Sequence, residues 1–355
     1  MLQMSQIEIK TAFIELGKFL KQFAIDGTTQ HKDVQNNREN IEAFEQLITL
    51  SQSHNGWFTP ENVHFSIQSW ANALTDEQLA KWLSDYDFST VQTKTVGLIL
   101  AGNIPLVGFH DFLSVLIAGH RVLIKTSSND QHLIKFLAKY LIAVEPKLID
   151  RITFTDGKLE NFDAVIATGS NNTARYFEFY FKDKPSIIRK NRNSVAVLNG
   201  NETHADLVAL GDDIFRYFGL GCRNVSKLFV PKDYNFETFF QAIFEYQDVI
   251  HYEKYANNYD YNKAVFLMSN FKLRDNGFLT LKEDVSYSSP ISSVFYEFYD
   301  DLNALSDRLQ TENEQIQCMV SNELVTKSIP FGKTQKPGLS EYADNVDTLN
   351  FLISI

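Results

Sequence analysis

From residue 95 onward the sequence alternates short aliphatic runs with segments of helix length. The aliphatic runs are TVGLILA (95–101), RVLIK (121–125), RITF (151–154), DAVIAT (163–168) and SVAVL (194–198). Segments such as HDFLSVLIAG and DQHLIKFLAKYLIA lie between them and are typical of helices. Because the runs are apolar almost throughout, the alternation predicts a parallel sheet covered on both faces. We therefore expect an α/β protein with an open, nucleotide-binding type of sheet.

The regions before and after this alternation have a different spacing of apolar residues. Apolar residues recur with helical period over the first ninety residues, which predicts a helical N-terminal region over 1–94. A sheet domain over 95–218 follows, since a helix pattern ends at Gly219 and the strand VSKLFV begins soon afterwards. We expect a smaller α/β domain over 219–325 and a tail over 326–355 that returns to the domain interface.

Charge and cysteine content exclude several functional classes. Acidic residues number 44 against 33 basic ones, a net charge of −11, which argues against a surface built to bind nucleic acid. The apolar runs fall far short of the roughly 20 residues of a membrane span, and the N-terminus lacks a secretory signal pattern. We expect a cytoplasmic protein whose two cysteines, Cys222 and Cys318, are free thiols. The histidine and cysteine spacing predicts no metal site.

Cys222 is the first candidate for chemistry, in the segment FGLGCRNVSKLFV between a predicted helix and a predicted strand. Gly219 and Gly221 permit positive φ angles and a close approach of substrate to the thiol. The neighbouring Arg223 favours a thiolate electrostatically, and a thiolate is a nucleophile that accepts acyl groups. The alternative is that Cys222 is simply a small buried apolar residue.

Polar residues also follow three of the predicted strands. Asn103 lies in the turn AGNIPLVGF, where its amide is suited to hold an oxyanion. The segment IKTSSND carries Lys125, Ser127 and Ser128, which suit a phosphate or a ribose, and Gly169-Ser170 closes another strand. An ordinary turn and a solvated loop are the alternatives. The dinucleotide fingerprint G-x-G-x-x-G is absent.

Taken in order, these signals resemble the aldehyde dehydrogenase superfamily. The resemblance implies an oxyanion-hole amide at Asn103, ribose contact at Lys125, pyrophosphate contact at Gly169-Ser170 and a nucleophile at Cys222 within Gly-x-x-Cys. GNIPL, IKTSSND, GLGCRNVSKLFVP and YADNVDTLNFL are most similar to the LuxC-like acyl-CoA reductase branch. It also implies an aldehyde-dehydrogenase-like fold and a homodimer, although the chain is short for the superfamily.

Three positions depart from the superfamily pattern. Arg189, in IIRKNRNSVAV, stands where aldehyde oxidisers carry the glutamate that activates water. Ser286 replaces the carboxylate that holds the nicotinamide ribose, and Ser128 replaces an acidic residue common in NAD-preferring members. Loss of the latter carboxylate removes a repulsion against a 2′-phosphate, which favours NADPH as cofactor.

The resemblance therefore implies NADPH-dependent reduction of an acyl-CoA or acyl-carrier thioester to an aldehyde, through an acyl-Cys222 intermediate. Three alternatives stay open at this point. One is a related reductase that acts on an acyl phosphate. The others are a non-catalytic acyl-thioester binding protein and a cysteine-dependent acyltransferase without a redox step.

Overall fold

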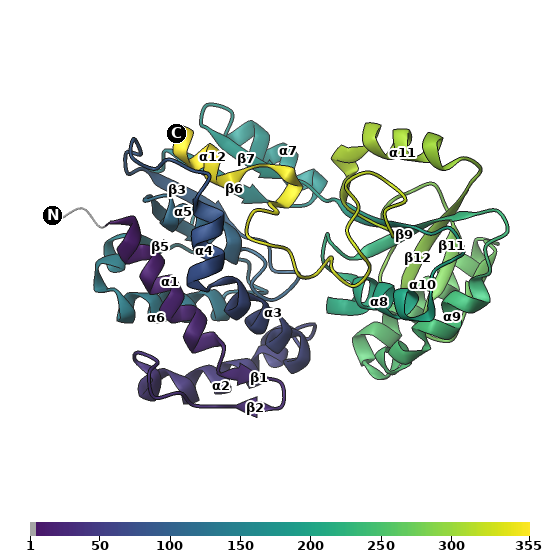
Figure 1. Cartoon of the computed structure of the whole chain (residues 1–355), viewed down its shortest axis with the longest axis horizontal. Helices are drawn as coiled ribbons and strands as arrows, with labels where there is room; N and C mark the ends of the chain where they lie inside the picture. The colour runs from purple at the N-terminus through teal and green to yellow at the C-terminus, as the bar shows by residue number, and fades with distance from the viewer. Residues whose placement is uncertain (1–4) are drawn as a thin grey trace. The chain divides into compact units, whose positions relative to one another are not determined.

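The computed structural model describes residues 5–355, which form two compact units. The first unit comprises residues 5–190 and 338–355, and the second comprises 191–337 (Figure 1). The second unit is thus an insertion between two segments of the first. The boundary expected after residue 218 falls inside the second unit, one strand and one helix beyond this division.

The N-terminal part of the first unit is helical, as the sequence predicts. Its elements are α1 (Gln6–Leu20), β1 (Phe23–Ala24), β2 (Gly27–Thr28), α2 (Asn37–His54), α3 (Pro60–Ala73) and α4 (Asp76–Leu83). Ser5 and Glu8 form a capping box at the start of α1, and Thr59 caps α3 ahead of Pro60. Helix α1 packs against α3, α5 and α6, so its apolar face is buried in the core that surrounds the sheet.

A five-stranded parallel sheet forms the centre of the first unit. Its elements in chain order are β3 (Thr95–Ile99), α5 (Phe109–Ile117), β4 (Arg121–Lys125), α6 (His132–Val144), η1 (Pro146–Asp150), β5 (Ile152–Phe154), β6 (Ala164–Thr168), α7 (Asn171–Tyr180) and β7 (Ser186–Arg189). The strand order is β5-β4-β3-β6-β7. The chain progresses from β3 through β4 to β5 and then returns to the other side of β3 with β6. The carboxyl ends of β3 and β6 therefore flank a topological switch point, where open α/β sheets bind their ligands.

The second unit contains a six-stranded sheet in the order β10-β11-β12-β9-β8-β13. Only β10 is antiparallel to its neighbour. The elements are β8 (Asn193–Val197), α8 (His204–Phe215), η2 (Arg216–Gly219), β9 (Val225–Pro231), α9 (Phe236–Ile243), η3 (Phe244–His251), α10 (Glu253–Met268), β10 (Leu273–Asp275), β11 (Thr280–Glu283), β12 (Ser293–Tyr299), α11 (Leu302–Thr311), η4 (Asn313–Gln315) and β13 (Ile316–Val320). Strand β9 leads directly from the cysteine segment into the middle of this sheet.

The predicted alternation of strands and helices is confirmed, with two differences in detail. Four of the five predicted strands form the first sheet, but the fifth, β8, belongs to the second sheet between β9 and β13. The first sheet takes β7 as its edge strand instead, and β7 was not predicted. Its sequence, SIIR, is too short for periodicity to mark it.

The C-terminal segment completes the first unit. Beyond η5 (Ala343–Asn345), helix α12 (Thr348–Ser354) packs against α5 and buries Leu349 and Leu352. The Leu352 carbonyl oxygen lies 2.8 Å from Nε2 of the buried His120. Helix α12, although distant in sequence, therefore covers α5, the helix that follows β3.

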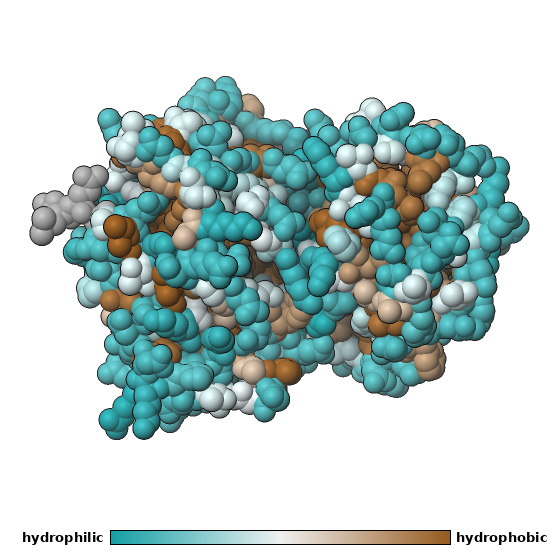
Figure 2. All heavy atoms as spheres, in the orientation of Figure 1, coloured by the Kyte–Doolittle hydropathy of each residue, from teal (hydrophilic) through white to brown (hydrophobic). Residues whose placement is uncertain are grey.

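The surface is mainly hydrophilic, as expected for a chain with a net charge of −11. In Figure 2 hydrophilic residues cover most of the visible face, with smaller hydrophobic patches between them. Across residues 5–355 no helix combines the length and apolar character that a membrane crossing requires.

Candidate active site

Cys222 is exposed and lies in a tight turn between η2 and β9, the junction that the sequence predicts. Asn224 closes this turn twice. Its backbone N–H donates to the Gly221 carbonyl at 3.0 Å, and its Oδ1 accepts from the Gly221 N–H at 2.8 Å. The Cys222 carbonyl in turn accepts a 3.0 Å hydrogen bond from Ser194 Oγ on β8. The turn thus presents an exposed thiol on a backbone held from two sides.

The backbone just before this turn is left-handed at three consecutive residues. Tyr217, Phe218 and Gly219 have φ angles of 54°, 58° and 77°. For residues with a Cβ this conformation costs about 1–2 kcal/mol each, so only the glycine adopts it without penalty. The sequence GLGC had suggested glycine-permitted geometry, but two aromatic residues carry most of it. Such strain persists only where surrounding contacts impose it.

Arg223 and Asp213 connect the cysteine turn to distant segments of the second unit. Nη1 of Arg223 lies 3.5 Å from Cys318 Sγ and 3.4 Å from the Thr334 carbonyl oxygen. The buried Asp213 carboxylate, on α8, accepts from Gly332 N–H at 2.7 Å and from Thr334 N–H and Oγ1 at 3.1 and 2.8 Å. Burial raises the pKa of Asp213 to about 6, although these hydrogen bonds oppose the rise. The segment after β13 is thereby fastened to the helix that precedes Cys222.

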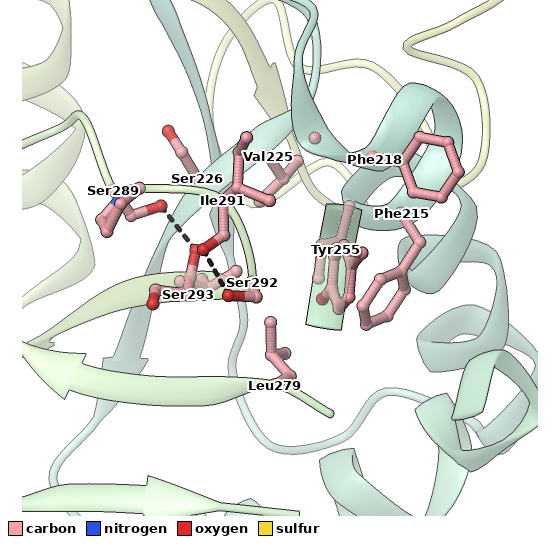
Figure 3. A pocket seen from close by; sticks show the side chains of 14 residues that line it. Phe215, Phe218, Val225, Ser226, Tyr255, Leu279, Ser289, Ile291, Ser292 and Ser293 are labelled. Atoms are coloured by element: carbon pink, nitrogen blue, oxygen red, sulfur yellow. Dashed lines mark hydrogen bonds between the residues drawn. The ribbon is translucent and has the colours of Figure 1, made fainter. Parts of the chain in front are cut away.

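A pocket borders the cysteine turn within the second unit (Figure 3). It encloses about 320 Å³ of empty space, part of it open to solvent. Phe215, Phe218 and Tyr255 line its aromatic side, and serines such as Ser226 and Ser293 line the side next to the strands. Phe218 and Gly219 form part of the pocket wall, and the Phe218 ring stacks on Tyr252 with ring centroids 4.5 Å apart.

Lys227, five residues beyond Cys222, has a fully buried side chain on β9. Its ammonium donates to the carbonyls of Asp284 and Val285, both at 2.9 Å, and to Glu297 at 2.7 Å. Desolvation lowers the pKa of Lys227, and the hydrogen bond and charge of Glu297 oppose this. The lysine therefore anchors the exposed loop that carries Ser286.

In the first unit, Asn103 and the hydroxyl-rich segment lie at the carboxyl ends of adjacent strands. Asn103 is exposed after β3, and Lys125 is the last residue of β4. A Cβ added to Gly102 would lie 2.7 Å from the Ser127 side chain, so only glycine permits this approach of the two loops. Ser128 is exposed in the second loop.

Asp130 holds these two loops together. Its Oδ2 accepts from the Leu106 N–H at 2.7 Å, where Leu106 has a φ of 57°. Its other oxygen, Oδ1, is buried and has no hydrogen-bond partner within residues 5–355. Burial raises the pKa of Asp130 to about 7. Ser66 Oγ adds a second tether by donating to the Pro105 carbonyl at 2.9 Å.

Gly169 and Ser170 lie at the same sheet edge, between the end of β6 and the start of α7. Ser170 is the N-cap of α7, and its Oγ accepts from the Thr173 N–H at 3.3 Å. A Cβ on Gly169 would lie 3.0 Å from both Thr173 and Phe177, so a larger residue would disturb the helix start. The first N–H groups of α7 thus meet the switch point beside β3, a geometry suited to an anion.

Arg189 opens a basic run, RKNR (189–192), whose side chains make internal contacts. Arg189 is 8 % exposed, forms an ion pair with the buried Asp111 on α5, and donates to Thr348 Oγ1 at 3.1 Å. Lys190 pairs with Glu178 at 2.6 Å. Arg189 is therefore a structural cation that joins β7, α5 and α12.

The structure accordingly divides the predicted site residues between the two units. Asn103, Lys125, Ser127, Ser128, Gly169 and Ser170 share one edge of the first sheet, and Cys222 belongs to the second unit. Sequence reasoning missed Asn224 and Asp130, whose roles depend on partners that no local motif reveals. Among residues 5–355 no cluster of three or more histidine, cysteine or acidic side chains is arranged to hold a metal ion.

Comparison with solved structures defines the fold class as that of aldehyde dehydrogenases. Aldehyde dehydrogenase 21 from Physcomitrella patens, in complex with succinate, aligns with a TM-score of 0.67 and 12% identity over 99% of this chain and 84% of that one. An aldehyde dehydrogenase from Mycobacterium tuberculosis, complexed with NAD+, aligns with a TM-score of 0.60 and 15% identity over 89% and 72%. The predicted fold class is confirmed.

A family profile gives the finer assignment. Residues 39–245, more than half of the chain, match the family described as acyl-CoA reductase (LuxC). The protein therefore belongs to the LuxC acyl-CoA reductase family, which confirms the resemblance found in the sequence. No curated protein sequence matches the chain.

Proposed function

We propose that the protein reduces an acyl thioester, a fatty acyl-CoA or acyl-carrier thioester, to the aldehyde with NADPH. The observation that carries this proposal is the exposed thiol of Cys222, in a strained glycine-bounded turn of a LuxC-family chain. An exposed cysteine suits nucleophilic catalysis, whereas a structural cysteine is normally buried.

In the first half-reaction the Cys222 thiolate attacks the thioester carbonyl. The resulting oxyanion would be stabilised by the Asn103 amide and the Cys222 backbone N–H. Collapse of the tetrahedral intermediate breaks the bond to the carrier sulfur, releases the carrier as its thiolate and leaves an acyl-Cys222 thioester. This half-reaction needs no reductant, so it is separable by experiment from the second.

The first sheet offers residues suited to a nicotinamide dinucleotide. Lys125 and Ser127 would contact the adenosine ribose, Ser128 would tolerate its 2′-phosphate, and Gly169-Ser170 with the α7 N-terminus would meet the pyrophosphate. The reported complexes of similar folds with NAD+ support a cofactor of this class. When bound, NADPH would supply the hydride that converts the acyl-Cys222 thioester to a hemithioacetal.

The second half-reaction ends when the hemithioacetal breaks down to aldehyde and the Cys222 thiolate. Hydrolysis of the acyl-enzyme would compete with this path if a nearby carboxylate activated water. At the position of that carboxylate the chain has Arg189, whose guanidinium is paired with Asp111. This substitution favours an acyl-enzyme that persists until a hydride or a thiol reaches it.

Mass spectrometry of the intact protein tests the proposal directly. Incubation with a fatty acyl-CoA should add one acyl group to the wild type, and NADPH should then remove it with formation of aldehyde. Cys222→Ser should lose the adduct, whereas Cys318→Ser, which alters the buried thiol on β13, should retain it. Absence of any adduct on the wild type would contradict the proposal.

The mass measurement, combined with nicotinamide absorbance, separates the alternatives. A reductase specific for acyl phosphates would oxidise NADPH with an acyl phosphate and not with the acyl-CoA. An acyltransferase would acquire the adduct and pass it to a thiol or amine without any change in nicotinamide absorbance. A binding protein would retain acyl-CoA after Cys222→Ser without ever forming an adduct.

A further inference from the structure

We infer that Asn224 is the residue that positions the Cys222 thiol for attack on the acyl group. This inference rests on the proposed function, because it assigns a role to a neighbour of the proposed nucleophile. Asn224 lies two residues after Cys222 and is 3 % exposed. It acts through the backbone of the cysteine turn and is a positioning residue rather than a catalytic one.

The Asn224 side-chain amide bonds to both ends of the segment 216–221, which leads to Cys222: its NH2 group donates at one end and its oxygen accepts at the other. Nδ2 donates to the Arg216 carbonyl at 2.8 Å and to the Asp213 carbonyl at 3.0 Å, at the end of α8. Oδ1 accepts from the Gly221 N–H at 2.8 Å. One planar group therefore fixes the distance between the end of α8 and the residue that precedes Cys222.

This hydrogen-bonded link spans the strained part of the backbone. Tyr217 and Phe218 lie between Arg216 and Gly221 and have φ angles of 54° and 58°. Without contacts that impose a positive φ, residues with a Cβ adopt a negative φ, and this change would move the turn. Phe218 lines the pocket on one side (Figure 3). The hydrogen bonds of Asn224 and the stacking of Phe218 on Tyr252, with ring centroids 4.5 Å apart, together hold the turn in place.

The chemistry of the contacts requires an amide at position 224. A carboxylate keeps an acceptor for Gly221 N–H but turns its second oxygen toward carbonyl oxygens, which repel it. A methyl group makes none of the contacts. Ser194, on β8, donates from Oγ to the Cys222 carbonyl. This bond does not connect the turn to α8, so it cannot replace the link made by Asn224.

The experiment compares Asn224→Asp and Asn224→Ala with the matched control Asn37→Asp. Asn37 is also a buried amide, 6 % exposed, that donates to Gln22 Oε1 and the His31 carbonyl, but it lies in the first unit. Amide hydrogen exchange is followed over residues 217–224. We expect exchange in this segment to accelerate about tenfold or more in both Asn224 variants and to stay unchanged in the control.

Two reaction rates of the Cys222 thiol, acylation and alkylation, test whether this positioning matters for catalysis. Acylation by a fatty acyl-CoA should fall about 100-fold in the Asn224 variants, because about 1 Å of misplacement costs that much. Alkylation by iodoacetamide, which needs only an exposed thiol, should stay within about threefold, and the buried Cys318 should remain unmodified. General unfolding would instead slow acylation while exposing Cys318, so it is distinguished by peptide mapping.

Unchanged exchange over 217–224 in both Asn224 variants would overturn the inference, as would wild-type acylation rates in them. If the wild type itself is not acylated, the proposed function fails, and the exchange result still decides whether Asn224 holds the turn. If Asn224→Ala does not fold, Asn224→Asp, which preserves volume and the Gly221 contact, gives the same comparison.

Discussion

The buried carboxyl group of Asp130 should make the stability of the first unit depend on pH. It accepts one hydrogen bond, from Leu106 N–H at 2.7 Å, while its other oxygen has no partner among the described residues. The substitution Asp130→Asn retains an oxygen for Leu106 and cannot ionise. The variant therefore removes the charge without removing the contact that joins the two loops.

The magnitude follows from the pKa of this group. Burial raises the pKa of Asp130 to about 7, against about 3.9 for an unperturbed aspartate, and each unit corresponds to about 1.4 kcal/mol. Because the folded pKa is raised, the favourable contribution is complete below about pH 4 and is lost as the pH rises to about 7. Relative to wild type, Asp130→Asn should gain up to about 4 kcal/mol in free energy of unfolding by about pH 8, and little near pH 4.

Tryptophan fluorescence provides a specific assay, because Trp57, Trp70 and Trp82 all lie in the first unit. Urea unfolding of wild type and variant is compared at about pH 5 and about pH 8. We expect the variant's advantage to grow between these values. The same difference in unfolding free energy at both pH values would refute the reasoning, since a lost or gained contact without a titrating charge acts equally at each.

Three further predictions concern other buried groups and the cofactor. Asp213→Asn should destabilise the second unit by about 1–3 kcal/mol. Both carboxylate oxygens accept hydrogen bonds, and an amide leaves the Gly332 N–H without its acceptor. Circular dichroism should show the unfolding transition at a lower urea concentration. Arg189→Met should cost the first unit about 3–5 kcal/mol by leaving the Asp111 carboxylate buried without its cation, seen in tryptophan fluorescence. Ser128→Asp should lower kcat/KM for NADPH relative to NADH by about tenfold or more, measured by steady-state kinetics, and an unchanged ratio would place the 2′-phosphate elsewhere.

The sequence predicted most of the architecture because local patterns carry it. Short apolar runs bounded by turn residues, such as those at β3, β4 and β6, are typical of buried strands. The position of Cys222 between a helix and a strand was likewise readable from its glycines and from the aliphatic run that follows.

Sheet membership and buried polar roles were not predictable in the same way. The strand β8 has the same apolar residue pattern as the strands of the first sheet. Only its pairing with β9 and β13 places it in the second sheet. Asp130 and Asn224 look like ordinary loop residues, since their importance arises from backbone groups 24 and up to 11 positions away. Nothing in the sequence around Arg189, IIRKNRNSVAV, indicates its ion pair with Asp111, which lies 78 positions earlier.

The interrupted first unit has a consequence for how the chain folds during synthesis. Residues 338–355 provide α12, which covers α5 and supplies Thr348 to Arg189. A ribosome releases these residues only after the whole of 191–337 has been made. The nascent first unit must therefore wait with an apolar helix face uncovered while the inserted unit emerges and folds, and this interval is when a chaperone would protect it from aggregation.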